Sequence, residues 1–255
     1  MRTVGGDQAS YQIQLLGEFA VSAGARSVID RSWTRRKAQA LIKFLALQKD
    51  GRLHREQVVD LLWPRLTLDD AANNLYKSLH YVRRACCEAG ETRPLIQATN
   101  NMVELTEGTV IDIDGFSTAA ERARAVRRDA QLYEDALAIY HGDLLPEDLY
   151  EEWTEPRRHE LFETRNRLLL EVSHLYDDQR RFDLAIDRLE ALIHADSLHE
   201  QAHLRLMMIF VASGKRDRAL RQYQYCRKAY ARELSAPPSE EIETLYQQIL
   251  NRASA

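Results

Sequence analysis

Two clusters of cationic side chains in the first half of the sequence have the chemistry needed to bind a polyanion. Arg35, Arg36 and Lys37 are adjacent, while Lys77 and Arg84 fall within one later stretch. Cations that line one surface bind phosphates by releasing counterions, so their clustering matters more than the total charge. The total is nearly balanced, with 15 Lys and Arg against 14 Asp and Glu up to residue 115, and 20 against 25 after it. The clusters make nucleic acid a candidate ligand.

The second cluster belongs to a predicted helix over residues 70–88. Its apolar residues recur at three and four residue spacing and predict one buried stripe, namely Ala72, Leu75, Leu79, Val82 and Cys86. The opposite face holds Asn73, Lys77, His80, Tyr81 and Arg84. Asn pairs with adenine and Lys or Arg with guanine in a major groove. We therefore expect Asn73 and Lys77 to contact bases, with His80, Tyr81 and Arg84 shared between bases and phosphates; a merely solvated face is the alternative.

The first cluster lies at the start of a predicted helix over residues 34–49, which Ser32 or Thr34 can cap. Exposed amides of a first helical turn also attract phosphate, so Arg35, Arg36 and Lys37 are phosphate candidates. Solubilising surface charge explains each of them about equally well. Arg52 and Arg55, at the start of a helix predicted over residues 55–63, are weaker candidates of the same kind.

A hairpin follows the helix of residues 70–88, with strands at 95–98 and 102–105. Between them lie Thr99, Asn100 and Asn101, and Asn tolerates the positive φ of tight turns. Thr99 and Asn100 are candidate phosphate contacts at the tip of such a wing, although ordinary turn chemistry explains them equally well.

The elements that position these residues have the order of a winged helix-turn-helix. Alternating β-formers over 11–23 and 27–30 predict a small antiparallel sheet, three helices follow, and the hairpin comes after them. A short strand over 110–114 closes this half. We expect a flexible N-terminus at 1–10 and a DNA-binding domain at 11–114.

The remaining residues, 115–255, predict an all-α domain of tetratricopeptide-like repeats. Ala185 and Ala219 lie 34 residues apart, the period of such repeats, and Tyr176 and Phe210 match at the same offset. A hairpin around Ala136 resembles a divergent first unit, and a helix over 240–251 after two prolines caps the stack. The aromatic residues that we expect in packing positions are Trp63, Tyr140, Trp153, Tyr176, Phe182, Phe210 and Tyr223. The fold class is therefore mainly α.

The sequence carries no pattern that indicates an enzyme. Phosphate-binding loops, nucleophile elbows and metalloprotease motifs are absent, and the three cysteines and eight histidines have no metal-ligand spacing. Asp112 and Asp114 alternate along the predicted strand, so they face one side and need no metal. We expect no catalytic residue, no metal and no cofactor. Without a leader or a long apolar run, we also expect a cytoplasmic protein that does not enter membranes.

Seven segments taken in order resemble the bacterial transcriptional activator domain proteins, including antibiotic regulatory activators. They are YQIQLLGEFAV, WTRRKAQALIKFLAL, HREQVVDLLWP, AANNLYKSLHYVRRAC, IDIDGF, YHGDLL and YARELSAPPSEEIETLYQQIL. The resemblance implies an OmpR-type winged helix and a tetratricopeptide-like activator domain. It further implies a homodimer that binds direct repeats in double-stranded DNA and recruits RNA polymerase. In related folds the loop at Arg65, Leu66 and Thr67 is placed to contact polymerase.

One rival function stays open at this point. The repeats could form a protein-interaction or ligand-sensing module whose winged helix docks a partner protein, and the chain could be a fragment of a larger regulator. Such a module has no need for Asn, Lys and Arg aligned on the exposed face of the 70–88 helix. That face therefore favours DNA, while the identity of any small-molecule effector stays unknown.

Overall fold

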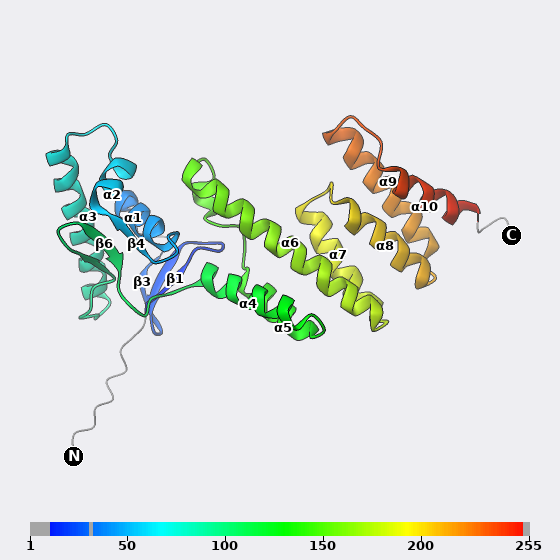
Figure 1. Ribbon diagram of the computed structural model, residues 1–255, viewed down its shortest axis with the longest axis horizontal. Coiled ribbons are helices and arrows are strands. Elements are labelled where there is room, and N and C mark those ends of the chain that lie inside the picture. Colours follow the sequence, from blue (N-terminus) through cyan, green and yellow to red (C-terminus); the bar gives the residue numbers. More distant parts are fainter. Residues whose placement is uncertain (1–10, 31–32, 252–255) are drawn as a thin grey trace, which may run out of the picture. The chain divides into compact units, whose positions relative to one another are not determined.

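A computed structural model describes residues 11–30 and 33–251 of the chain (Figure 1). The expected flexible N-terminus at 1–10 and the proposed capping residue Ser32 lie outside the described residues. The order of elements confirms the predicted fold class, with small sheets and three helices first and a run of helices after them.

The chain divides into two compact units. The first unit comprises Met1–Thr118 and Ile139–Leu161, and the second comprises Ala119–Ala138 and Phe162–Ala255. Residues 139–161 thus pack with the elements that come early in the chain, although they lie beyond residue 114 in the sequence.

A four-stranded sheet opens the first unit. Its strands are β1 (Tyr11–Gln14), β2 (Ala20–Ala23), β3 (Arg26–Ile29) and β7 (Val110–Ile111), in the order β3-β2-β1-β7. The antiparallel part, β1 to β3, is as predicted. β7 pairs with β1 in parallel, with Gln12 opposite Val110 and Ile13 opposite Ile111, and this pairing was not predicted from the sequence. The sheet buries Tyr11, Ile13 and Val21.

The strand predicted over 110–114 is too long. Only Val110–Ile111 is extended, because Asp112 begins α4 (Asp112–Val126). The Asp112 carboxylate accepts hydrogen bonds from the backbone amides of Leu15 and Leu16, at 2.8 to 3.0 Å, and from that of Ile113. Burial raises the pKa of Asp112, and these amide donors oppose the rise. Asp112 therefore joins the helix start to β1, and its expected alternation with Asp114 along a strand was wrong.

Three helices follow the sheet, namely α1 (Arg36–Ala46), α2 (Arg55–Leu62) and α3 (Leu68–Glu88). Their number and order are as predicted, but α1 is shorter than residues 34–49 at both ends. Arg35 takes the N-cap position with no side-chain cap, so the expected cap at Thr34 was wrong. After α1 the chain turns at Gly51, whose φ of +65° suits glycine. α2 ends before Pro64, as the restriction on the preceding Trp63 requires.

A second sheet carries the predicted hairpin. It has the order β4-β6-β5, with β4 (Arg52–His54), β5 (Ile96–Ala98) and β6 (Met102–Leu105). The hairpin β5–β6 is as predicted, whereas β4 is an additional short strand. The turn is closed by the Thr99 amide, which donates to the Met102 carbonyl at 2.9 Å, and by the Met102 amide, which donates to Thr99 Oγ1. No asparagine among the described residues has positive φ, so that expectation for the turn was wrong.

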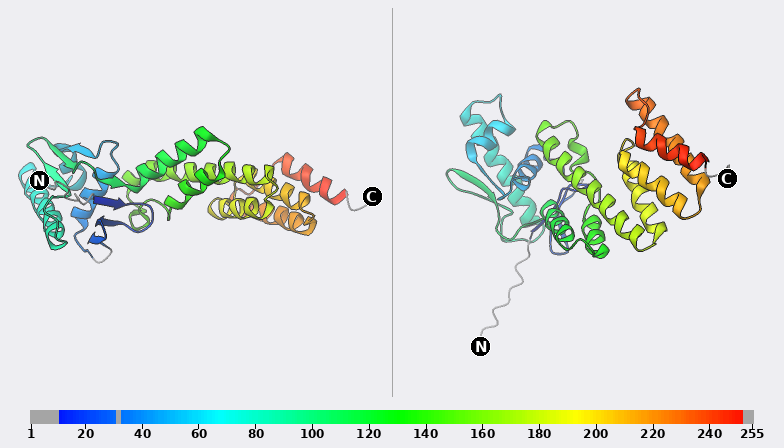
Figure 2. Two further views of the ribbon diagram at one scale, coloured as in Figure 1. Left: turned by 90° about the horizontal axis from the view of Figure 1, so that it is seen from below. Right: turned by 45° about the vertical axis from the view of Figure 1, so that its right-hand side comes forward.

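The second unit is built from helices packed one after another (Figures 1 and 2). They are the end of α4, α5 (Ala130–Ile139), most of α6 (Glu155–Asp178), α7 (Phe182–Ala195), α8 (Glu200–Ala212), α9 (Arg216–Glu233) and α10 (Glu240–Asn251). α7 and α9 begin 34 residues apart, and the matched Ala185 and Ala219 are both fully buried. The repeat predicted from the sequence is therefore present as a repeat of helices.

The aromatic residues expected in packing positions fall into two groups. Tyr176, Phe210 and Tyr223 are buried, as predicted. The side chains of the other four are only half-buried, namely Trp63, Tyr140, Trp153 and Phe182. Full burial is thus confirmed for three of these seven residues.

Candidate nucleic-acid interface

The exposed face of α3 is held outward by a buried stripe on its other side. The stripe consists of Ala71, Leu75, Ser78, Val82, Ala85 and Cys86. It is rotated from the predicted one, because Ala71 and Ser78 are buried in place of Ala72 and Leu79. Ser78 can lie in the core since its hydroxyl donates to the Asn74 carbonyl at 3.0 Å, which satisfies it within the helix.

The start of α3 is fixed by a side-chain cap. Thr67 Oγ1 accepts a hydrogen bond from the Asp70 amide at 3.2 Å and donates to the Asp70 carboxylate at 2.8 Å. The sequence suggested that Asp69 or Asp70 begins the helix, but it starts at Leu68. Capping fixes the position of the first turn, and with it the register of the residues that follow on the exposed face.

The residues expected to contact bases are brought together on that face. Asn73, Lys77 and His80 are exposed and lie three or four positions apart along the helix. Arg84 continues the same face one turn later and forms an exposed ion pair with Glu88 at 2.7 Å. That bond raises the pKa of Arg84. A solvated ion pair of this kind exchanges easily for a phosphate.

Tyr81 differs from the other four because it is half-buried. The guanidinium of Arg35 lies over its ring, 4.5 Å from the centroid. A groove joins these two residues, with walls formed by the first turn of α1 and the middle of α3, including Asn74 and Lys77. The two cationic clusters that are separate in sequence are therefore neighbours in the fold.

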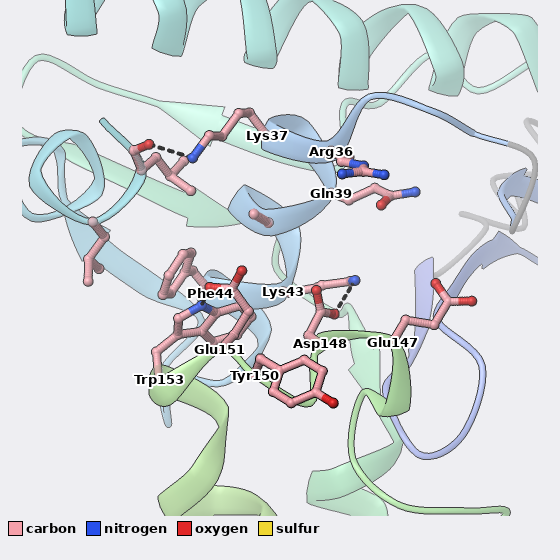
Figure 3. Close-up of a pocket in the computed structure, with 13 residues that line it drawn as sticks. Arg36, Lys37, Gln39, Lys43, Phe44, Glu147, Asp148, Tyr150, Glu151 and Trp153 are labelled. Atoms are coloured by element: carbon pink, nitrogen blue, oxygen red, sulfur yellow. Dashed lines mark hydrogen bonds and ion pairs between the residues drawn. The ribbon is translucent and has the colours of Figure 1, made fainter. Parts of the chain in front are cut away.

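Lys37 is less available than its position in the sequence suggested. Its ammonium group donates to the backbone carbonyl of Leu62 at 2.7 Å, which ties the first turn of α1 to the end of α2 (Figure 3). Arg35 and Arg36 are exposed. Of the three adjacent cations, Lys37 thus has a hydrogen bond within the fold in addition to any contact with a ligand.

An arginine and tyrosine pair that the sequence did not bring together lies beside the α3 face. Arg55 stacks over the Tyr76 ring at 4.5 Å and donates to the Tyr76 hydroxyl at 3.1 Å. Tyr76 is 57% exposed, one position before Lys77. The sequence could have indicated Tyr76 by its place on the exposed side of the helix. Without the knowledge that Arg55 stacks on it, however, Tyr76 resembles an ordinary solvated aromatic residue. Arg52, the other weak candidate, pairs with Asp50.

The tip of the wing is exposed, including Thr99 and Asn100. The turn is fastened to the start of α2, because the Arg55 amide donates to the Asn101 carbonyl at 2.9 Å. Thr99 has a structural contact within the turn, so only part of its hydrogen-bonding capacity is open to a ligand.

The loop between α2 and α3 holds the residues expected to contact polymerase. Arg65 and Leu66 are exposed, and Leu66 and Leu68 expose 46% and 74% of their surfaces. Thr67 caps α3, so it is engaged in the fold. The loop thus presents apolar side chains that the first unit leaves uncovered.

A second hollow, of about 560 Å³, lies on another side of α1, where Phe44 and Lys43 meet the segment around Asp148 (Figure 3). Trp153 packs on Phe44 with ring centroids 4.2 Å apart. The Lys43 ammonium is buried and pairs with the Asp148 carboxylate. The sequence singled out Arg36, Lys37 and Trp153, which line this hollow, but gave no sign that they share one.

The described residues contain no group of three or more His, Cys, Asp or Glu side chains that could hold a metal ion. Within the same ranges, 11–30 and 33–251, no helix is both long and apolar enough to cross a membrane. The three cysteines are unpaired, with Cys86 and Cys226 buried and Cys87 exposed.

Known proteins resemble this chain over most of its length. The regulatory protein AfsR of Streptomyces griseus is 27% identical over 228 residues, covering 83% of this chain and 22% of that protein. The chain thus spans about a fifth of the length of this curated relative. A structure of Mycobacterium tuberculosis EmbR, in complex with a low-affinity phosphopeptide, matches with a TM-score of 0.73 at 19% identity, covering 96% of this chain and 65% of EmbR.

The EmbR structure shows that the fold of this chain recurs nearly from end to end in another protein. At the level of family, the profile of the bacterial transcriptional activator domain matches residues 111–250, more than half of the chain. The family comprises transcription regulators and is not an enzyme family. The chain belongs to the bacterial transcriptional activator domain family.

Proposed function

We propose that this chain is a sequence-specific DNA-binding transcription activator that inserts α3 into the major groove. The observation that carries the proposal is the exposed face of α3, where Asn73, Lys77 and His80 stand opposite a buried stripe within a winged-helix fold. A major groove is wide enough for one helix, and Asn and Lys match the edges of adenine and guanine. DNA binding belongs to residues 11–114, with dimerisation or regulation in 115–255.

The roles of the side chains follow from their positions. Asn73 and Lys77 contact bases, and His80 and Tyr81 contact bases at the edge of the site. The residues that bind phosphates are Arg35, Arg36, Lys37, Arg84, Thr99 and Asn100. Lys37 reaches a phosphate only if it releases or shares its bond to the Leu62 carbonyl. Arg55, stacked on Tyr76, adds a further cation beside the same helix.

The chain binds as a homodimer on two repeated half-sites, and the α2–α3 loop contacts RNA polymerase. Arg65 and Leu66 are the loop residues free to do so, because Thr67 caps α3. Leu66→Ser is therefore expected to reduce transcription from a bound promoter while the affinity for DNA stays unchanged. In vitro transcription beside a binding isotherm separates the two effects.

The experiment that tests DNA binding is selection of fragments from the source genome by the full chain at near-physiological salt, followed by footprinting. Enriched promoter fragments with two similar half-sites about 10 base pairs apart are the expected result. Absence of binding, or binding indifferent to sequence, would overturn the proposal and favour a protein-interaction module.

A further inference from the structure

Two pairs of arginine and tyrosine lie along α3, and each pair joins this helix to the start of another one. Arg35, which precedes α1, stacks over Tyr81 with its guanidinium 4.5 Å from the ring centroid. Arg55, the first residue of α2, stacks over Tyr76 at the same distance of 4.5 Å. The second pair also has a hydrogen bond, because Arg55 Nη1 donates to the Tyr76 hydroxyl at 3.1 Å. The two pairs are therefore alike in chemistry.

The two tyrosines lie on opposite flanks of the exposed face of α3. Tyr76 follows Asn73 by three positions and Tyr81 follows it by eight. Since an α-helix turns by about 100° per residue, Tyr76 lies about 60° to one side of Asn73 and Tyr81 about 80° to the other. By the same count, Lys77 and His80 fall about 40° and 20° from Asn73, between the two tyrosines. The residues expected to contact bases thus lie between the two pairs.

A helix in a major groove meets both strands of the DNA. With its side chains an α-helix is about 10 to 12 Å across, and the major groove is about 12 Å wide. The middle of the exposed face then lies against the base edges, and each flank lies against the sugar and phosphate groups of one strand. On this geometry Tyr76 and Tyr81 lie beside different strands.

The pair of Arg55 and Tyr76 has the charge and the donors that bind a phosphate. Within residues 11–30 and 33–251 the Arg55 guanidinium forms no ion pair, and its exposed neighbour Glu56 does not bond to it. A guanidinium has five N–H donors, of which Tyr76 uses one. Because the Tyr76 hydroxyl accepts that bond, its own proton is available to a further acceptor. A phosphate oxygen is such an acceptor, and its charge is opposite to that of Arg55.

This pair is held in place before any ligand binds. The Arg55 amide donates to the Asn101 carbonyl at 2.9 Å, which joins the start of α2 to the wing turn. Arg55 is half-buried, whereas Tyr76 on α3 is 57% exposed. Groups that are ordered before binding lose little entropy when a ligand arrives.

We propose that the two pairs are phosphate clamps for opposite strands of the DNA. Arg55 and Tyr76 hold one strand, and Arg35, supported by the Tyr81 ring, holds the other. This inference rests on the proposed function and adds Tyr76 to the residues that contact DNA. Because α3 is held from both flanks, its exposed face is centred over the base edges.

The test is ethylation interference on the cognate site found by the genomic selection. An ethyl group on a contacted phosphate blocks binding, and the two strands are examined separately. For the unsubstituted chain we expect interference on both strands of each half-site. Arg55→Ala is expected to abolish the interference on one strand, and Arg35→Ala that on the other. Each should weaken binding to all sequences about tenfold, as expected for the loss of one charge-assisted hydrogen bond.

Two further variants separate a clamp from a general loss of structure or charge. Tyr76→Phe keeps the ring beside Arg55 and removes the hydroxyl, so it should weaken interference on the same strand as Arg55→Ala, but to a smaller extent. Arg122→Ala, at an exposed arginine of the second unit, is the matched control and should leave both strands unchanged. Equal unfolding curves of the four variants exclude a folding defect.

The outcomes distinguish this inference from the function on which it rests. If Arg35→Ala and Arg55→Ala lost interference on the same strand, or if Arg55→Ala left the pattern unchanged, the clamps would be wrong although sequence-specific binding by the unsubstituted chain would still support the proposed function. Absence of sequence-specific binding by the unsubstituted chain would overturn the proposed function, and this inference with it.

Discussion

The exposed face of α3 and the helix contacts of the second unit use charged and polar side chains in opposite ways. On α3 in the first unit, Asn73, Lys77 and His80 are exposed, and within residues 11–30 and 33–251 no hydrogen bond or ion pair joins them to another element. In the second unit, Glu134 on α5 accepts hydrogen bonds from Tyr176 on α6 and Arg188 on α7, both at 2.9 Å. Polar side chains on α3 are therefore available to a ligand, whereas these polar side chains of the second unit join helices to one another.

This difference teaches where substitutions should affect binding and where they should affect folding. Exposed side chains without partners leave the free energy of unfolding nearly unchanged when they are removed. Side chains that join helices leave unsatisfied groups behind, which costs stability. Tryptophan fluorescence reports on the first unit alone, because Trp33, Trp63 and Trp153 all belong to it.

The largest expected effect concerns a cation of the first unit that is part of the fold and is not available to a ligand. Lys43→Met removes a buried ammonium and leaves the Asp148 carboxylate, with 23% of its side chain exposed, without its partner. We expect the first unit to lose about 3 kcal/mol of stability, the lower end for breaking a buried ion pair. Urea unfolding followed by tryptophan fluorescence measures it. Arg52→Ala, which breaks an exposed pair with Asp50, is the control and should leave the midpoint unchanged.

A smaller effect tests the α3 face itself. Asn73→Ala and Lys77→Ala should each weaken binding to the selected cognate site by about 1 to 3 kcal/mol, because each removes one base contact. The affinity for non-cognate DNA should fall less, and the unfolding midpoint of the protein should not change. Binding isotherms on both DNAs measure the two effects. If cognate and non-cognate affinities fell together, neither residue would read bases.

How well the sequence predicts this face depends on the particular residue. The exposed set Asn73, Lys77 and His80 could be identified because helical spacing separates it from Leu75 and Val82. The buried stripe was placed one residue off at Ala71, since the apolar letters alone do not distinguish Ala71 from Ala72. Ser78 was missed because its burial depends on the bond to the Asn74 carbonyl, which composition does not reveal.

Contacts between distant segments explain the other omissions. Arg55 and Tyr76 are 21 positions apart, and their stacking follows from how α2 and α3 pack. Residues 143–155 gave no signal of joining the first unit, because that contact depends on Leu144 pairing with Leu16 and Asp148 with Lys43. By contrast, the 34-residue repeat was predicted because its evidence is local and periodic.

In the second unit, Tyr223 is a further polar side chain that joins two helices, so it tests the difference between the units. Its hydroxyl donates to the Glu243 carboxylate at 2.8 Å, which joins α9 to α10, and its ring stacks on Tyr246 at 3.7 Å. Burial and this bond raise the pKa of Tyr223 to about 12. We expect Tyr223→Phe to cost about 1 kcal/mol of stability at pH 8, the usual net value of one hydrogen bond, and to leave DNA binding unchanged.

The dependence of the free energy of unfolding on pH gives a second test of that prediction. Below pH 10 the phenol is protonated in both folded and unfolded chains, so its contribution to stability is complete. As pH rises from 10 to about 12, the unfolded chain ionises first, and the contribution is lost. The stability difference between the unsubstituted chain and Tyr223→Phe should shrink over this range in urea unfolding followed by circular dichroism. Tyr225→Phe, at a half-exposed tyrosine of the same helix, is the control at pH 8 and should leave the unfolding midpoint nearly unchanged.

The smallest expected effect distinguishes phosphate contacts from base contacts within the first unit. Arg36 is exposed in the first turn of α1, whereas its neighbour Lys37 is bonded to the Leu62 carbonyl, so Arg36 is the cleaner position to substitute. Arg36→Ala should weaken binding to all DNA sequences alike. It should also make the slope of log affinity against log salt less negative by about 0.9, the value for one phosphate.

Titrations at several salt concentrations on cognate and non-cognate DNA measure that slope, with Lys77→Ala as the comparison. A phosphate contact changes the slope and spares specificity, while a base contact lowers specificity. If Arg36→Ala lowered affinity for the cognate site alone, the first turn of α1 would take part in base readout. The groove between α1 and α3, where Arg35 stacks on Tyr81, would then have to lie against the base edges, and α3 would not be the sole reading helix.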